Sequence, residues 1–225
     1  MNKNAFFDVD HTLYDGYLGT NFNHFMVERG HASKRAADEE DRLTRDYRAG
    51  VIDYREAAGS SLQLTADCVS GKTVETIRKW QGEFIERHNY IFPWVASLIG
   101  ILRERGFTIY LISAAPLPPL EAVAKLLDVE DYYGTEFEVV DDTYTGRLKT
   151  TLNYEEKHTL IQKLIGETKA GLHIGFGDSL GDVDMLSAMD KAFLYSPKSQ
   201  ELIDIANSRG WQIVDATTIL SSAFD

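Results

Sequence analysis

The chain is poor in cysteine and in basic residues, and both shortages narrow what it can do. Cys68 is the single cysteine among 225 residues, so an intrachain disulfide is impossible and a reducing compartment is expected. Lysine and arginine number 23 against 35 aspartates and glutamates, which gives a net charge of −12. Because nucleic-acid-binding proteins usually present a basic surface, this balance argues against a nucleic-acid partner.

Long hydrophobic runs are also missing. The longest apolar stretch, around Trp94 to Leu102, is much shorter than the roughly 20 residues that a membrane-spanning helix needs. Asp8 and Asp10 interrupt the apolar residues near the N-terminus, so no signal peptide is recognisable. We therefore expect a soluble, cytoplasmic protein without a membrane partner. Nothing in the sequence indicates its oligomeric state.

What the chain does contain is an alternation of short apolar runs with amphipathic segments. Five runs have the near-continuous hydrophobicity of strands covered on both faces: Asn4–Val9, Thr108–Ser113, Leu172–Gly177, Lys191–Tyr195 and Gln212–Val214. Helical patterns occupy Pro93–Arg105, Leu120–Leu127, Tyr154–Ile165, Asp182–Met189 and Ser199–Ser208. Strands that alternate with helices predict an α/β fold with a doubly wound, mostly parallel sheet.

Residues 16–90 break this alternation. They contain helical patterns and no convincing strand, with the helices expected at Tyr17–Arg29, Ser33–Ala49, Tyr54–Leu64 and Thr73–His88. We therefore predict a catalytic core formed by residues 1–15 and 91–225, with residues 16–90 as a small helical insert over the sheet edge. A short strand pair is expected at Tyr132–Val140 and Thr143–Lys149.

Two of the predicted strands end in acidic residues. Asp8 and Asp10 follow the first strand, and Asp178 and Asp182 follow the strand that begins at Leu172. Two carboxylates about 4 Å apart repel by roughly 4 kcal/mol at an effective dielectric near 20, so four of them at one sheet edge need a cation. Mg²⁺ prefers hard oxygen ligands. We predict that Asp8, the backbone carbonyl of Asp10 and Asp178 bind Mg²⁺, with Asp182 at the metal site as an orienting residue that acts through water.

The same aspartates suit phosphate-ester hydrolysis through a covalent intermediate. Asp8 would attack phosphorus, which divides a very slow reaction into two easier steps. Asp10 would protonate the leaving group and later activate water. Both roles require the chain to curl after Asp8, and the Asp-His-Thr sequence that follows permits a turn.

Two further residues fit a phosphate site. Ser113 ends a predicted strand, so its hydroxyl and the N–H groups that follow, beginning with Ala114, are expected to donate to phosphate oxygens. Lys157 lies in the first turn of a predicted helix, where an unpaired lysine opposes the helix dipole. It is expected to balance the carboxylates and the phosphate, with Lys149 and Lys163 as the nearby competitors.

In this arrangement the sequence resembles the haloacid dehalogenase superfamily of phosphatases, in its phosphoserine-phosphatase-like branch. The four motifs match, in chain order, Asp8-x-Asp10-x-Thr12, Ser113, Lys157 and the run from Gly177 to Leu186. The resemblance implies a Rossmann-like core with a mobile helical cap of the first type, and it adds Thr12 to the expected phosphate-binding residues. Dehalogenases lack an aspartate at the position of Asp10, so dehalogenation is disfavoured.

The resemblance does not extend to phosphoserine as the substrate. Phosphoserine phosphatases place a glutamate and an arginine against the substrate's amine and carboxylate, and this chain has Tyr17 and Ser61 at the aligned positions. Arg55, elsewhere on the same predicted helix, is an alternative for the arginine. Aromatic residues of the insert, including Tyr17 and Tyr54, are expected to line the cap side of the pocket and to bind substrate. A partly apolar or cationic organic phosphate is compatible with such a lining.

These observations predict a Mg²⁺-dependent phosphatase that acts on a small phosphorylated metabolite. Two alternatives remain open. A phosphotransferase or mutase of the same fold would pass the phosphoryl group to a hydroxyl instead of water. A non-catalytic phosphate-binding protein would keep the fold without turnover, although such relatives usually lose the nucleophile or a metal ligand.

Overall fold

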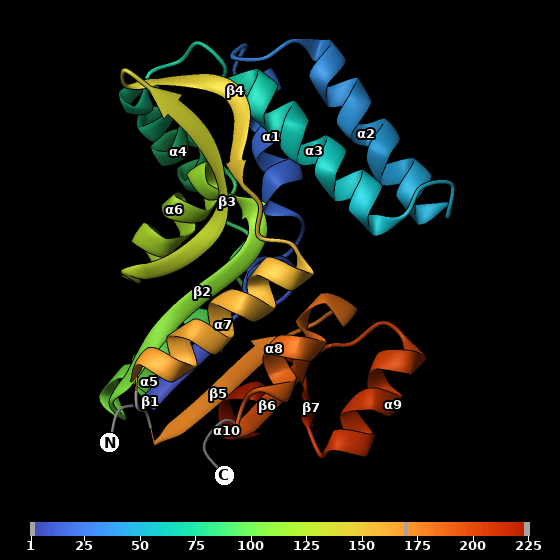
Figure 1. Cartoon of the computed structure of the whole chain (residues 1–225), viewed down its shortest axis with the longest axis vertical. Coiled ribbons are helices and arrows are strands. Elements are labelled where there is room, and N and C mark those ends of the chain that lie inside the picture. The colour runs from blue at the N-terminus through green and yellow to red at the C-terminus, as the bar shows by residue number, and fades with distance from the viewer. Residues whose placement is uncertain (1–2, 169–170, 223–225) are drawn as a thin grey trace.

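A seven-stranded sheet runs through the protein (Figure 1). In the computed structural model, which describes residues 3–168 and 171–222, the strand order is β4-β3-β2-β1-β5-β6-β7. The strands are β1 (Lys3–Phe7), β2 (Phe107–Pro116), β3 (Asp131–Val140), β4 (Thr143–Thr150), β5 (Leu172–Gly177), β6 (Lys191–Tyr195) and β7 (Gln212–Val214). Every pairing is parallel except that of β3 with β4. The predicted fold class is confirmed.

Helices connect the strands and cover both faces of the sheet. Those between β1 and β2 are α1 (Leu18–Glu28), α2 (Lys34–Arg48), α3 (Tyr54–Val69), α4 (Val74–Arg87) and α5 (Val95–Glu104). The later ones are α6 (Leu117–Leu126), α7 (Tyr154–Thr168), α8 (Val183–Ser187), α9 (Gln200–Arg209) and α10 (Ile219–Ser222). None of the described helices combines the length and the apolar character that a membrane span requires.

Alternating side chains of the strands enter two separate apolar clusters. In β1, Ala5 and Phe7 belong to a cluster with residues of α5, α6 and α10, whereas Phe6 belongs to one with residues of α7, α8 and α9. β2 divides in the same way, with Leu111 on the first side and Ile112 on the second. This explains why the strands read as continuous apolar runs, because both of their faces are covered.

The helical segment after β1 shares part of this core. Residues of α1 and α4 lie in the same apolar cluster as the sheet, and α4 packs on α6. α2 lies at the periphery of the molecule, and α3 lies between α2 and β4 and packs on both (Figure 1). The division into a core and a cap at residues 16–90 therefore stays a prediction, because the core cluster crosses that boundary.

Several element boundaries differ from the sequence-based expectation, and three of the differences bear on the site. β2 continues beyond Ser113 to Pro116, with an irregular register against β3 between Ile112 and Pro116. α3 continues to Val69, which is buried and packs in the main core. The helix expected at Asp182–Met189 begins instead with a 3-10 turn, Leu180–Asp182, because Ser179 and Asp182 form a reciprocal capping box there.

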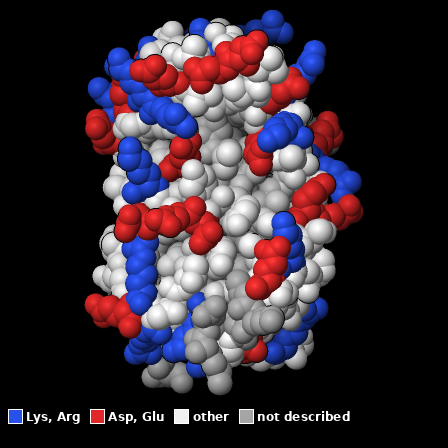
Figure 2. Space-filling model, turned by 60° about the vertical axis from the view of Figure 1, so that its left-hand side comes forward, with Lys and Arg blue, Asp and Glu red and all other residues white. Residues whose placement is uncertain are grey.

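The surface charges are mixed despite the net negative charge. On the face shown in Figure 2, lysines and arginines are interspersed with aspartates and glutamates around a central uncharged strip. Among the described residues, charged side chains also form exposed pairs of opposite sign, such as Lys149 with Glu136 and Arg42 with Glu39. Exposed pairs of this kind contribute little to stability, at most about 1 kcal/mol each.

Candidate active site

The centre of the site lies where β1 and β5 end side by side. The N–H of Asp8 donates to the carbonyl of Phe176 at 2.9 Å, which continues the parallel pairing of the two strands. This register brings the carboxylates of Asp8 and Asp178 together, and Asp182 joins them from the turn that follows β5. One oxygen of each of the three lies within 4.8 Å of the others.

The loop after β1 forms the curl that the two proposed roles require. The N–H groups of Thr12, Leu13 and Tyr14 all donate to the carbonyl of Val9, at 3.2, 2.9 and 2.9 Å. His11 takes a positive φ of 58°, a conformation that histidine adopts more readily than most residues. The loop places Asp10 at the start of α1, where its carboxylate accepts a 2.8 Å hydrogen bond from the N–H of Leu18.

Lys157 is the basic residue of this centre. Its ammonium donates to Asp8 Oδ1 at 2.9 Å and to Asp182 Oδ1 at 2.6 Å, and its side chain is buried. The two competing lysines lie elsewhere: Lys149 pairs with Glu136, and Lys163 faces Glu167 on the exposed side of α7. Lysine in the first turn of α7 is thus held by the carboxylates that it neutralises.

Asp182 orients the loop that follows β5. Its Oδ2 accepts hydrogen bonds from the N–H groups of Asp178 and Ser179 and from the Ser179 hydroxyl, at 3.1, 3.1 and 2.9 Å. Gly177 makes room for it, because a Cβ at that position would lie 2.6 Å from the Cβ of Asp182. With Lys157 on its other oxygen, Asp182 has most of its acceptor capacity occupied by the protein.

Burial and mutual repulsion raise the pKa values of Asp8, Asp10 and Asp178. Burial is the main cause for Asp8 and Asp178, and the charge of Asp182 adds to it. Burial likewise raises the pKa of Asp10 to about 7, with a further contribution from the charge of Asp8. Burial alone would lower the pKa of Lys157, but Asp182 and Asp8 outweigh it and raise that pKa instead.

The cluster offers the donors that Mg²⁺ prefers. It gathers three carboxylates around one ammonium, so in its ionised form it has an excess of negative charge that a divalent cation would offset. All of its free donor atoms are hard oxygens, which suit Mg²⁺ better than softer metals. The residues therefore fit this metal.

The three remaining sequence-predicted phosphate residues are placed differently from one another. The hydroxyl of Thr12 donates to Asp178 Oδ1 at 3.2 Å, so it supports that carboxylate. The hydroxyl of Ser113 is buried within β2 and accepts from the N–H of Ala115 at 3.1 Å. Ala114 lies at the surface of both cavities described next.

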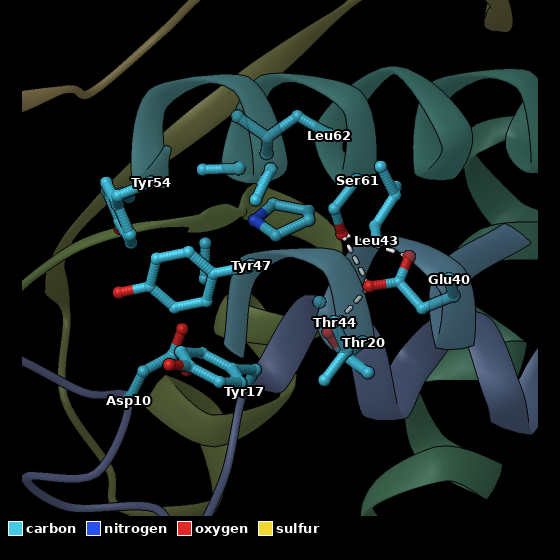
Figure 3. A pocket seen from close by; sticks show the side chains of 16 residues that line it. Asp10, Tyr17, Thr20, Glu40, Leu43, Thr44, Tyr47, Tyr54, Ser61 and Leu62 are labelled. Atoms are coloured by element: carbon cyan, nitrogen blue, oxygen red, sulfur yellow. Dashed lines mark hydrogen bonds between the residues drawn. The ribbon is translucent and has the colours of Figure 1, made fainter. Parts of the chain in front are cut away.

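Two neighbouring cavities open beside the cluster. The larger, of about 210 Å³, is lined by Asp8, Lys157 and Asp182 from the sheet edge and by residues of α3, including Arg55. The smaller, of about 90 Å³, lies between α1, α2 and α3 and reaches Asp10 (Figure 3). Tyr54 borders both cavities, whereas Tyr17 borders only the smaller. The two tyrosines expected on the cap side thus lie at cavity walls.

Glu40 is a site residue that sequence reasoning missed. It lines the smaller cavity from α2 and is only 1% exposed. Its helix reads as strongly charged, which favours a solvent-exposed interpretation. A signal was nevertheless present, because Ala36, Glu40 and Leu43 recur at helical spacing and are the buried residues of α2.

Comparisons with known proteins agree with this arrangement. The family model described as haloacid dehalogenase-like hydrolase matches residues 5–187. A putative hydrolase of Mycobacterium leprae, ML2424, is 29% identical over 97% of this chain and 74% of its own length. Phosphoserine phosphatase SerB1 of Mycobacterium tuberculosis is 27% identical over 94% of this chain and 70% of its own. A substrate-bound phosphoserine phosphatase complex superimposes with a TM-score of 0.70 at 16% identity, covering 99% of this chain and 98% of that one.

Proposed function

Because the chain belongs to the haloacid dehalogenase-like hydrolase family, we propose that it is a phosphatase that hydrolyses a small phosphate monoester through a phosphorylated Asp8. The observation that carries this proposal is the position of the Asp8 carboxylate, which lies at a cavity wall and against the ammonium of Lys157. The relative SerB1, named as a phosphoserine phosphatase, supports the same reaction class.

The proposed reaction has two steps. A carboxylate oxygen of Asp8 attacks phosphorus while the ester P–O bond breaks, and protonated Asp10 gives its proton to the departing alkoxide. Water then attacks the phosphorus of the acyl phosphate as Asp10 takes a proton from it. Inorganic phosphate leaves and the Asp8 carboxylate is restored. The raised pKa of Asp10, about 7, supports a group that holds and releases a proton near neutral pH.

Asp8, Asp178 and the backbone carbonyl of Asp10 are the residues that we propose to hold Mg²⁺. When bound, the ion would neutralise negative charge on the phosphoryl group and on the attacking carboxylate. The hydrogen bonds of Asp182 favour a positioning role for it, since they occupy both of its oxygens. Thr12 supports Asp178 in the same manner.

Lys157, Ser113 and the N–H of Ala114 are proposed to receive the phosphoryl oxygens. Lys157 is the best supported of the three, because its ammonium already lies between two carboxylates at the cavity. We also propose that residues 16–90 act as a cap that excludes water from the cavities. The single Cys68 supports a reducing, cytoplasmic location for this chemistry.

Phosphoserine is proposed to be a poor substrate. Ser61 hydrogen-bonds to Glu40 and provides no positive charge for a substrate carboxylate. Arg55 lines the larger cavity beside Asp8 and Lys157, but no lysine or arginine is among the described residues that line the smaller cavity, so a substrate carboxylate placed there would be unpaired.

The test is hydrolysis of a generic aryl phosphate with Mg²⁺ present and after chelation. We expect Asp8→Asn and Asp10→Asn each to lose about 10³-fold or more in kcat, since each removes a group that participates in bond making or proton transfer. Full activity in either variant would rule out the mechanism. Transfer to added alcohols in preference to water would indicate a phosphotransferase instead.

A further inference from the structure

Glu40 is a buried carboxylate whose contacts are all with neutral groups. Its Oε1 accepts from the hydroxyls of Thr20 and Ser61 at 2.7 and 2.9 Å. Its Oε2 accepts from the Asn23 side-chain amide at 2.9 Å and from Ser61 at 3.0 Å. These bonds join α1, α2 and α3 at one point and orient the carboxylate at the wall of the smaller cavity (Figure 3).

Among the residues that the structure describes, no lysine, arginine or histidine forms an ion pair with Glu40. Buried carboxylates in proteins are usually paired with a cation, because neutral donors compensate only part of the lost hydration. Among the described residues lining the cavity, Asp10 and Glu40 are acidic and none is lysine or arginine. The cavity is therefore built to favour positive charge in its occupant.

The other walls suit an organic cation in particular. Tyr17, Tyr47 and Tyr54 line the cavity, and in Figure 3 their rings lie on the Asp10 side, opposite Glu40. The rings of Tyr47 and Tyr54 have centroids 6.0 Å apart and an interplanar angle of 67°, so they present differently directed surfaces. Aromatic faces attract ammonium groups, and quaternary ammonium ligands are commonly recognised in this way.

We propose that this cavity binds a positively charged amine or ammonium group carried by the phosphate ester, with Glu40 as the residue that selects for it. The inference rests on the proposed phosphatase function and names its substrate class. The cavity, of about 90 Å³, has room for a small ammonium group.

Matched ester pairs that differ in charge test the proposal directly. Phosphocholine is compared with 3,3-dimethylbutyl phosphate, its neutral isostere, and phosphoethanolamine with propyl phosphate. We expect kcat/KM to favour the cationic member by roughly 10- to 100-fold, since a site built for a polar partner discriminates strongly against analogues that lack it. The larger ratio identifies whether the preferred cation is quaternary or primary. Equal turnover within both pairs would overturn the inference.

A variant separates charge recognition from the structural role of Glu40. In Glu40→Gln we expect the ratio of kcat/KM within each pair to fall to near one, because only the cationic member loses a charged partner. A residue that only joins the three helices would lower both members equally, and that outcome would contradict the proposal. Glu39→Gln is the matched control, because Glu39 is on the same helix, is exposed and pairs with Arg42.

Binding measurements distinguish failure of this inference from failure of the proposed function. In the Asp8→Asn protein with Mg²⁺, calorimetry should show tighter binding of phosphocholine or phosphoethanolamine than of its neutral partner. If that preference is present but the wild-type protein hydrolyses no ester at all, the phosphatase assignment fails and the cation site stands. If an aryl phosphate is hydrolysed without any preference in binding, the cation site fails alone.

Discussion

The sheet edge and the helical pocket both bury carboxylates, but they compensate the charge differently. At the sheet edge, Asp8 and Asp182 share the ammonium of Lys157. In the pocket among α1, α2 and α3, Glu40 receives only hydroxyl and amide donors. The sheet edge contains one ammonium group but still has more carboxylates than cations. Among the described residues that line the pocket, none is lysine or arginine. Under the proposed function, the sheet edge would supply the chemistry and the pocket would depend on its ligand for positive charge.

Replacing the ammonium of the sheet edge should have the largest effect. In Lys157→Met, Asp8 and Asp182 stay buried without their cation, so we expect kcat for an aryl phosphate to fall by about 10²- to 10³-fold. The free energy of unfolding should decrease by about 3–5 kcal/mol, as when one partner of a buried ion pair is removed. Steady-state kinetics and urea denaturation measure the two effects.

Lys163→Met is the control for this change. Lys163 lies on the same helix but is exposed, and its nearest acidic partner, Glu167, is 3.9 Å away. Lys163→Met should change the free energy of unfolding by less than about 1 kcal/mol and leave kcat unchanged. Equal behaviour of the two variants would remove the distinction between the buried centre and the surface.

Because carboxylates outnumber cations at the sheet edge, we expect the stabilisation by Mg²⁺ to depend on pH. The pKa values of Asp8, Asp10 and Asp178 are raised by burial in the metal-free protein, that of Asp10 to about 7 from 3.8. The folded protein therefore keeps protons that the unfolded chain releases near pH 4, and its stability decreases as the pH rises from about 4 through 7. Mg²⁺ displaces these protons, so it stabilises more at high pH.

Thermal unfolding at pH 5 and pH 8 checks this expectation. The increase in Tm on adding Mg²⁺ should be larger at pH 8 by at least about 2–4 °C, which corresponds to roughly 1 kcal/mol for a chain of this size. Asp178→Asn should lose most of the response. An equal increase at both pH values would contradict the coupling between the metal and the buried carboxyls.

The pocket should show the smallest effect when one neutral donor is removed. Ser61→Ala takes away the hydroxyl that donates to both oxygens of Glu40, so we expect the free energy of unfolding to fall by about 1 kcal/mol. Aryl phosphate hydrolysis should stay within twofold, because the sheet edge is untouched. Ser60→Ala, at the exposed neighbouring position, is the control. A large loss of aryl phosphatase activity in Ser61→Ala would show that the two regions are not separable.

The contrast also explains what the sequence could predict. Asp8, Asp10 and Asp178 follow buried strands, and parallel strands bring their carboxyl ends to one edge of the sheet. The apolar pattern and the expected topology were therefore sufficient to predict that these residues lie near one another. Sequence position alone does not distinguish Lys157 from Lys149 and Lys163, which lie close to it in the chain. The structure makes the choice, because only Lys157 of the three contacts the buried aspartates.

The helical pocket was largely hidden because its form depends on how three helices pack. Tyr17 and Tyr54 could be assigned to it only as aromatic residues of the insert. Glu40 becomes buried because α1 and α3 cover it, and nothing adjacent in the sequence distinguishes it from Glu39. The extension of β2 past Ser113 likewise comes from pairing with β3, which the apolar run did not reveal.

Locating the phosphoryl group during turnover tests most directly whether Asp8 is the nucleophile. The protein is mixed briefly with Mg²⁺ and an aryl phosphate, quenched in acid and digested, and the phosphorylated peptide is identified by mass spectrometry. If Asp8 is the nucleophile, it will carry an acid-stable, base-labile phosphate that is absent from the Asp8→Asn protein. Rapid hydrolysis with no phosphate on Asp8, or with phosphate on a different residue, would contradict it.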